Sequence, residues 1–236
     1  MADQSTVYVD YMLYGLRGYN KLATEELRAI FHNNQEPDGH LDGNAHWLAY
    51  TPGMLYGVAE NYLLSDDREE FEQLLPQTLR ALDWCLERIR DAASESGSGD
   101  GLVAGEQNDL TGTGYWAFDQ AYLYAGVEAM GKALQRYGSP RAAECLKTAG
   151  EYCARIINAM SAASVQSPLV ELRDHTWSPY VPSNAADPRR NFQLWYPSDV
   201  DTGAMHLLRL SAVPEQGVLA DALLNEYVSA WMGDGK

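Results

Sequence analysis

Two segments with helical spacing carry almost no charge, and they constrain the fold more than any other feature of the chain. Residues 52–64 and 115–134 are apolar or small on nearly every side, with Gly57 and Gly126 inside them. A helix with so little polar surface has to be enclosed by other elements. Interior glycine costs a helix about 0.5–1 kcal/mol unless close packing offsets it. Residues 201–211 have the same character, so we expect three inner helices.

Other segments show one apolar face only. From Phe71 to Ile89 the apolar residues recur at spacings of three and four, with charged residues on the opposite side. This pattern predicts an amphipathic helix, and similar patterns predict helices over 141–160 and from about Val218 to Trp231. Asp66 followed by Glu69 predicts a capping box at the start of the first one. Because no segment shows the sustained alternation of a sheet, we predict an all-α chain.

The two segments with little charge, 52–64 and 115–134, follow similar loops. Gly39 and Gly101 each stand after an aspartate and lie 62 residues apart. Each unit therefore consists of a glycine-rich loop, an inner helix, a short turn and an amphipathic helix. A third unit begins with a longer loop at 164–198. This organisation predicts αα-hairpin repeats in one domain, 1–236, made of about three hairpins and an N-terminal helix.

The charge and composition of the chain indicate which kinds of partner and which cell compartment suit it. The formal net charge of −16 disfavours nucleic acid and anionic membrane surfaces, and a neutral ligand fits better. No apolar run is long enough to cross a bilayer. The first ten residues lack the basic and apolar regions of a signal peptide, so we expect a cytoplasmic protein. Cys85, Cys145 and Cys153 fall in helical patterns without a CxxC pair, which predicts reduced core residues.

The three long loops, 33–47, 98–116 and 164–198, combine carboxylates with aromatic rings. This mixture is typical of carbohydrate sites, because flat rings stack on the apolar faces of sugars while polar groups hydrogen-bond the hydroxyls. The candidate substrate-binding residues are Asp38, His46, Trp47, Tyr115, Trp116, Arg173, Asp174, Trp177 and Trp195.

Several of these residues also have a purely structural interpretation. Asp38 precedes a glycine and suits an ordinary turn. His40 and His46 show no recognised metal-binding spacing, so we predict neither a metal nor another cofactor. Glu106 and Asp109 lie between glycines, off any amphipathic face and beside two aromatic residues. For these two, contact with a ligand and a solvated loop are equally supported.

Three stretches resemble a known family. SPLVELRDHTWSPYVP (167–182) resembles the SP-x-x-x-LRDGT-x-x-P-x-x-P stretch of large bacterial proteins with a six-hairpin glycosidase-like domain, with His175 in place of the usual glycine. WYPSDVDTGAMHL (195–207) is similar to the segment that follows there, and DGLVAGE (100–106) resembles the GL-x-P-x-G loop before an inner helix. The likeness covers roughly residues 35–225, in the order of the family.

The resemblance implies part of an (α/α)6 toroid, with a glycan cleft formed by long loops at the N-terminal end of the inner helices. It also implies a glycoside hydrolase with paired carboxylates, inversion being favoured. Inverting enzymes hold the two carboxyl groups about 6.5–9.5 Å apart, and retaining enzymes about 5–5.5 Å. On the matching loop Glu106 is the candidate general acid, with Asp109 as its neighbour or substitute. Asp199 is the candidate base.

The chain has fewer predicted helices than a complete toroid of the resembling family needs. Six hairpins need about twelve helices, and the patterns here predict about seven. The chain is then a fragment lacking a C-terminal half, a form closed by homo-oligomerisation, or a half-toroid. The half-toroid could be a carbohydrate-binding module without catalysis. A further alternative is another α-toroid enzyme, such as a terpene cyclase or polysaccharide lyase. QEPDG (35–39) is similar to the Q-x-x-DG repeat of triterpene cyclases, but the DxDD and DDxxD motifs are absent.

Overall fold

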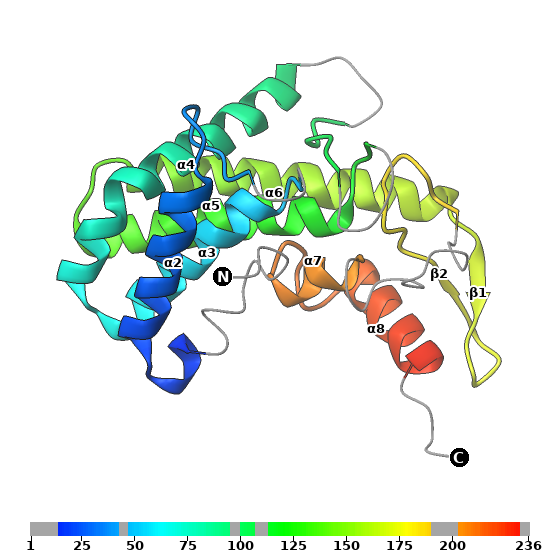
Figure 1. The fold of residues 1–236 in the computed structure, drawn as a ribbon. Helices are drawn as coiled ribbons and strands as arrows, with labels where there is room; N and C mark the ends of the chain where they lie inside the picture. The colour runs from blue at the N-terminus through cyan, green and yellow to red at the C-terminus, as the bar shows by residue number, and fades with distance from the viewer. Residues whose placement is uncertain (1–13, 43–46, 95–99, 107–112, 190–202, 232–236) are drawn as a thin grey trace.

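The computed structural model describes residues 14–42, 47–94, 100–106, 113–189 and 203–231. This part of the chain forms the elements η1 (Gly15–Arg17), α2 (Asn20–Asn34), α3 (Tyr50–Ser65), α4 (Arg68–Ser94), α5 (Ala117–Tyr137), α6 (Ala142–Gln166), β1 (Leu169–Glu171), β2 (Trp177–Pro179), α7 (Met205–Arg209) and α8 (Val218–Trp231) (Figure 1). The prediction of a mainly helical chain is therefore confirmed. None of the described helices has the length and apolar character needed to cross a membrane.

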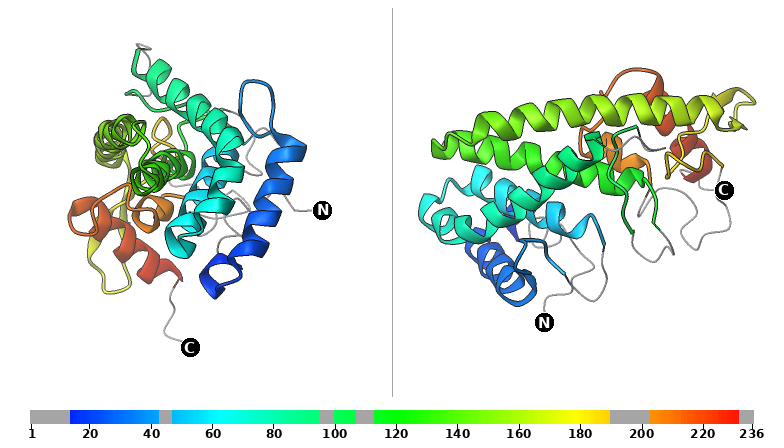
Figure 2. Two further views of the ribbon diagram at one scale, coloured as in Figure 1. Left: turned by 90° about the vertical axis from the view of Figure 1, so that its left-hand side faces the viewer. Right: turned by 90° about the horizontal axis from the view of Figure 1, so that it is seen from above.

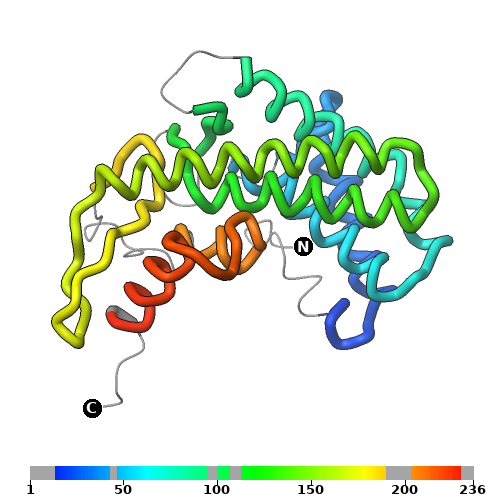
Figure 3. The backbone as a smooth tube through the Cα atoms, turned by 180° about the vertical axis from the view of Figure 1, so that it is seen from behind, coloured from blue at the N-terminus to red at the C-terminus, as the bar shows by residue number. Residues whose placement is uncertain are grey.

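The long helix α5 lies at the centre of the described structure. It packs against α3 on one side and α6 on another, and the short helix α7 also contacts it (Figures 2 and 3). A Cβ atom at Gly126 would lie only 2.3 Å from the carbonyl oxygen of Pro52 in α3. At Gly131 it would lie 2.8 Å from the Leu146 side chain of α6. Close approach between helices thus explains the glycines in the uncharged segment.

Helix α4 has the amphipathic character that its sequence predicts. Its buried residues include Phe71, Leu82 and Ile89. The predicted cap is wrong by one residue, because the Asp67 carboxylate accepts the Glu70 backbone N–H at 3.1 Å, one position after the predicted pair. Asp66 instead ends α3 in the left-handed conformation, with φ 54°. Helix α3 extends further than the pattern predicts and occupies the position expected for the cap.

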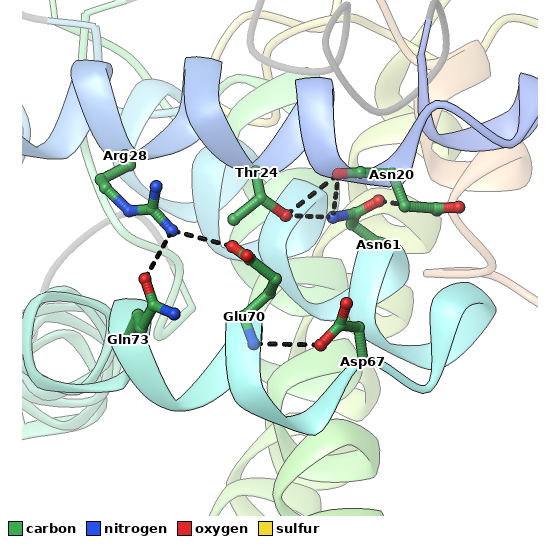
Figure 4. A network of polar contacts seen from close by, with 7 residues as sticks. All are labelled: Asn20, Thr24, Arg28, Asn61, Asp67, Glu70 and Gln73. Atoms are coloured by element: carbon green, nitrogen blue, oxygen red, sulfur yellow. Dashed lines mark hydrogen bonds and ion pairs between the residues drawn. The ribbon is translucent and has the colours of Figure 1, made fainter.

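Helix α2 is joined to α3 and α4 by polar side chains (Figure 4). The buried amide of Asn61 on α3 accepts a hydrogen bond from Asn20 at 2.9 Å and donates one to Thr24, also at 2.9 Å. On α4, Glu70 pairs with Arg28 at 2.8 Å. The N-terminal helix is therefore fixed on the others by specific contacts as well as by apolar burial.

The segment after α6 forms the two-stranded antiparallel hairpin, which the sequence did not predict because each strand has only three residues. Val170 and Ser178 face inward and pair across the hairpin, and β2 contacts α8. His175 in the turn has φ 64°, a left-handed conformation that glycine adopts most easily. The histidine thus keeps the backbone conformation suited to the glycine usual in the resembling pattern.

Two further predictions concern α7 and the cysteines. The inner helix predicted at 201–211 is shorter, because α7 ends before Ser211, which has φ 57°. The prediction that the cysteines form no disulfide is confirmed, because all three are free. Two of them are buried, and Cys153 is half-buried. Burial raises the pKa of the Cys145 thiol to about 11, which disfavours the reactive thiolate.

Candidate functional site

The loops before α3 and α5 meet at the N-terminal ends of these helices. The backbone N–H of Leu48 donates to the carbonyl oxygen of Glu106 at 3.1 Å, which places Trp47 and Glu106 side by side in a parallel bridge. Within the second loop, Gly105 and Gly114 exchange two backbone hydrogen bonds, of 3.0 and 2.9 Å. Two loops that are distant in sequence therefore form one surface.

A third segment joins the same surface on the other side of the second loop. The backbone N–H of Ala117 donates to Ser183 at 2.7 Å, and that of Ala185 donates to Tyr115 at 3.0 Å. The side-chain oxygen of Asn184 also accepts the backbone N–H of Tyr115 at 3.2 Å. Residues 183–185 belong to the third long loop. They were not among the predicted site residues, because nothing in their local pattern signals a bridge.

Glycine is required where the segments of this junction touch. A Cβ atom at Gly105 would lie 2.5 Å from the Cβ of Leu48, and one at Gly114 would lie 2.5 Å from the side-chain nitrogen of Asn184. A larger residue at Gly105 would press on the Leu48 side chain at its Cβ, and one at Gly114 would displace the side chains of Asn184 and Trp116. These glycines therefore set the shape of the junction between the three loops, which we call the loop junction (residues 47–48, 105–106, 114–117 and 183–185).

The loop junction brings together four of the predicted site residues. Trp47, Tyr115 and Trp116 are half-buried, and Glu106 is exposed. Within the described residues the indole N–H of Trp116 is buried and makes no hydrogen bond. The junction thus brings three half-buried aromatic residues and one exposed carboxylate into neighbouring positions.

A cavity of about 260 Å³ opens beside the loop junction, between the first loop and α4, and we call it the α4 cavity. Its wall includes Trp47 and Gly105 from the junction, His40 from the first loop, and Trp84 and Arg88 from α4. The His40 and Trp84 rings stack with centroids 5.8 Å apart. Trp84 and Arg88 were not predicted as site residues, because their positions on α4 fit an ordinary amphipathic helix.

Asp38 lies next to this cavity and contacts His40. Its carboxylate oxygen is 2.5 Å from Nδ1 of His40 and also accepts the His40 backbone N–H at 3.2 Å. Partial burial would raise the pKa of Asp38, but these hydrogen bonds and the positive charge of Arg88 outweigh it and lower the pKa. Asp38 is therefore an anion at neutral pH that holds the His40 ring in place.

Three predicted residues of the third loop, Arg173, Asp174 and Trp177, lie elsewhere, on the β-hairpin, at the end of the molecule beside α8 (Figure 1). The Arg173 backbone N–H donates to Ser229 of α8 at 2.8 Å. Asp174 accepts the backbone N–H of Thr176 at 3.0 Å and its hydroxyl at 2.7 Å, which shapes the turn and lowers the pKa of the aspartate. Trp177 is 61% exposed. These residues do not belong to the loop junction.

A second cavity, of about 330 Å³, lies between the hairpin and α8, and Arg173 and Glu226 are part of its wall. It shares no lining residue with the α4 cavity. The structure thus divides the predicted site into two groups. Four predicted residues, His46, Asp109, Trp195 and Asp199, lie outside the described residues. Among the described residues no cluster of three or more His, Cys, Asp or Glu side chains could hold a metal ion.

Asp119, in the first turn of α5, is a carboxyl group that was not predicted as a site residue. It is completely buried, and within the described part of the chain neither side-chain oxygen makes a hydrogen bond of normal geometry. Burial raises its pKa well above the usual range, and the nearby backbone N–H of Ala49 opposes this only in part. Asp119 therefore keeps its proton to a higher pH than an exposed aspartate does. One feature of the sequence could have pointed to Asp119: it is the only charged residue from Ala117 to Val127.

The neighbouring Gln120 shows how a buried polar group is normally satisfied. Its side chain donates to the Val103 carbonyl at 2.9 Å and accepts the Val103 backbone N–H at 3.2 Å. The Tyr152 hydroxyl also donates to it. This network fixes the second loop on α5 and α6 just before the loop junction.

Comparison with known proteins adds no assignment to this geometry. No known family model matches the chain, and no curated protein sequence matches it significantly.

Proposed function

We propose that the loop junction forms a carbohydrate-binding cleft and that the protein is glycoside hydrolase-like, cleaving a glycosidic bond with paired carboxylates. One observation carries the proposal: Trp47, Tyr115, Trp116 and Glu106, from two separate loops, gather at one end of α3 and α5. Aromatic rings beside a carboxylate match what a sugar offers, namely apolar ring faces and hydroxyl groups.

The finer description of the fold is part of the same proposal. We propose that α3 with α4, α5 with α6 and α7 with α8 are successive αα-hairpins of a partial (α/α)6 toroid. The contacts of α5 with both α3 and α7 support α3, α5 and α7 as the inner helices. The long loops would then stand at the N-terminal ends of this inner layer, where the loop junction lies.

In the proposed reaction, Glu106 donates a proton to the glycosidic oxygen while a second carboxylate activates water. The candidate for that second group is Asp199, while Asp109 is the neighbour or substitute of Glu106, and a separation of about 6.5–9.5 Å between acid and base would favour inversion. Asp119, whose pKa is raised by burial, is not the acid of this proposal, because both of its oxygens are buried beneath the surface.

The second candidate is a carbohydrate-binding module without catalysis. It is favoured by the exposure of Glu106, whose side chain projects into solvent. Glycosidases commonly shelter the general acid from water so that it stays protonated near neutral pH. Binding by the aromatic residues needs no such shelter.

The deciding experiment compares wild type with Glu106→Gln on aryl glycosides and on plant and bacterial oligosaccharides, with binding followed by calorimetry. Glu151→Gln, at an exposed position on α6, is the matched control. A glycosidase would lose at least about a hundredfold in kcat with Glu106→Gln, while binding and the control stay unchanged. Binding without turnover in all three proteins would support the binding module, and neither binding nor turnover would reject both proposals.

A further inference from the structure

We infer that the α4 cavity receives a sugar unit that bears a carboxylate, with Arg88 as its cationic partner. The inference rests on the proposed function, because it names the kind of sugar bound next to the loop junction. Arg88 and Trp84 of α4 form one wall of this cavity, and Trp47 of the junction forms part of another.

Arg88 differs from its neighbours on the same helix. Arg68 pairs with Glu72 at 3.1 Å, and Arg90 approaches Glu144 at 4.0 Å. Arg88 has no such ion pair with any described carboxylate, although the chain carries a formal net charge of −16. Its guanidinium carbon instead lies 5.2 Å from the centroid of the Trp84 ring. An exposed guanidinium at a cavity wall, stacked on an aromatic ring, is positioned to bind an anion.

Arg88 brings a donor-only side chain to the cavity wall. Arginine and the tryptophan indole are donor-only side chains. The indole N–H of Trp84 is buried and has no hydrogen-bond partner among the described residues. Asp38, the carboxylate whose charge interacts with Arg88, is engaged by His40. A ligand that supplies acceptor oxygens therefore fits, and a planar carboxylate matches the fork of the guanidinium best.

Size and overall charge restrict the ligand further. At about 260 Å³ the cavity is smaller than the range of about 300–1,000 Å³ for drug-sized ligands, which favours one ring rather than several. Trp47 and Trp84 contribute aromatic side chains to the wall around that ring. The strongly negative chain would repel a polyanion. We therefore expect one acidic sugar in an otherwise neutral glycan.

The test uses tryptophan fluorescence to titrate the whole chain with two matched pairs of methyl glycosides: glucuronide with glucoside, and galacturonide with galactoside. At least one acidic sugar is expected to bind about tenfold or more tightly than its neutral counterpart, the scale of one charge-assisted hydrogen bond. Arg88→Gln should abolish this preference. Arg90→Gln removes the same charge two positions along α4, outside the cavity wall, and should preserve the preference.

The outcomes separate this inference from the proposed function. Equal binding of acidic and neutral sugars by wild type would overturn the inference and leave the carbohydrate site standing. Equal loss of preference in Arg88→Gln and Arg90→Gln would also overturn it, because only general charge would then matter. If wild type bound none of the four glycosides and none of the oligosaccharides tested above, both would fail. The preference of wild type decides the matter even if Arg88→Gln does not fold.

Discussion

Helix α5 and the β-hairpin are both held against a neighbouring helix, but by different kinds of contact. At Gly126, α5 approaches α3 so closely that a Cβ atom would lie 2.3 Å from the Pro52 carbonyl oxygen. The hairpin meets α8 through the hydrogen bond from Arg173 to Ser229, while Leu169 and Trp177 are more than half exposed. The first contact involves the backbone of two buried helices and the second lies at the surface.

This difference separates positions that shape the proposed cleft from positions that are free to vary. The loop junction stands on the first turns of α3 and α5, so its geometry depends on how closely these helices pack. A buried backbone contact has little room to adjust to an added methyl group. A surface turn can adjust, which is consistent with a histidine in place of the glycine usual in the resembling pattern.

The most severe test of the comparison is Gly126→Ala. The added methyl group would clash with Pro52, and we expect the free energy of unfolding to fall by about 2 kcal/mol despite the better helix propensity of alanine. Gly150→Ala is the control, because nothing lies within 4 Å of the position that its methyl group would take on α6. It should stabilise the protein by up to about 1 kcal/mol. Urea unfolding measures both, and a stabilising Gly126→Ala would show that the helices separate easily.

A second prediction concerns the buried carboxyl group of α5. Folded Asp119 keeps its proton above the pH at which the unfolded chain, with a pKa near 3.8, loses it. The folded state then binds more protons, so the contribution of Asp119 to stability is greatest below pH 3.8 and falls as the pH rises toward the folded pKa, by up to about 1.4 kcal/mol per pH unit. Asp119→Asn cannot ionise, and we expect it to remove this decline and to stabilise the protein by about 1 kcal/mol or more at pH 8 relative to wild type.

The measurement is urea unfolding from pH 4 to pH 8. Asp91→Asn, at an exposed position on α4, serves as the control and should follow the wild-type curve. Parallel curves for wild type and Asp119→Asn would mean that Asp119 is ionised in the folded protein and has a partner that the hydrogen-bond geometry does not reveal.

The smallest effects are expected in the hairpin. A non-glycine residue in the left-handed region costs about 1–2 kcal/mol, so His175→Gly relieves strain. It also loses the exposed ion pair with Glu171 and adds freedom to the unfolded chain. These effects nearly cancel, and we expect a change within about 0.5 kcal/mol in thermal unfolding.

His175→Val completes this test. Valine is branched at Cβ and fits the left-handed conformation poorly, so we expect a loss of about 1 kcal/mol or more. Equal stability of the glycine and valine variants would indicate that the turn does not hold this conformation, and the comparison between the two regions would lose its basis.

Local sequence patterns were sufficient to predict the helices. Apolar spacing predicted α4, α6 and α8, and the scarcity of charged residues predicted that α3 and α5 are buried. These signals succeed because residues three and four apart lie on one face of a helix, whatever the rest of the chain does. Such patterns could not predict the three-residue strands, because a segment of that length contains too little periodicity. They could not locate the cap of α4 either, because the neighbouring residues Asp66 and Asp67 are equally suitable capping residues.

The candidate site was predictable only in part. Its loop residues combine chemistry that the sequence displays, and four of them do come together at the loop junction. The sequence could not show that Asn184 joins the junction, or that Arg88 and Trp84 of α4 face the same cavity as Trp47. Nor could the sequence show that Arg173, Asp174 and Trp177 lie on the hairpin, away from the loop junction.

The sequence by itself therefore determined the helical elements, the burial of α3 and α5 and the strongly acidic character of the chain. Tertiary structure alone decided which loops meet, that Arg88 lies over the Trp84 ring at a cavity wall and that the Asp119 carboxyl group is completely buried. The physical reason is range. Helical periodicity depends on neighbours within one or two turns, whereas a contact such as Leu48 with Glu106 depends on how whole helices pack, which no local pattern encodes.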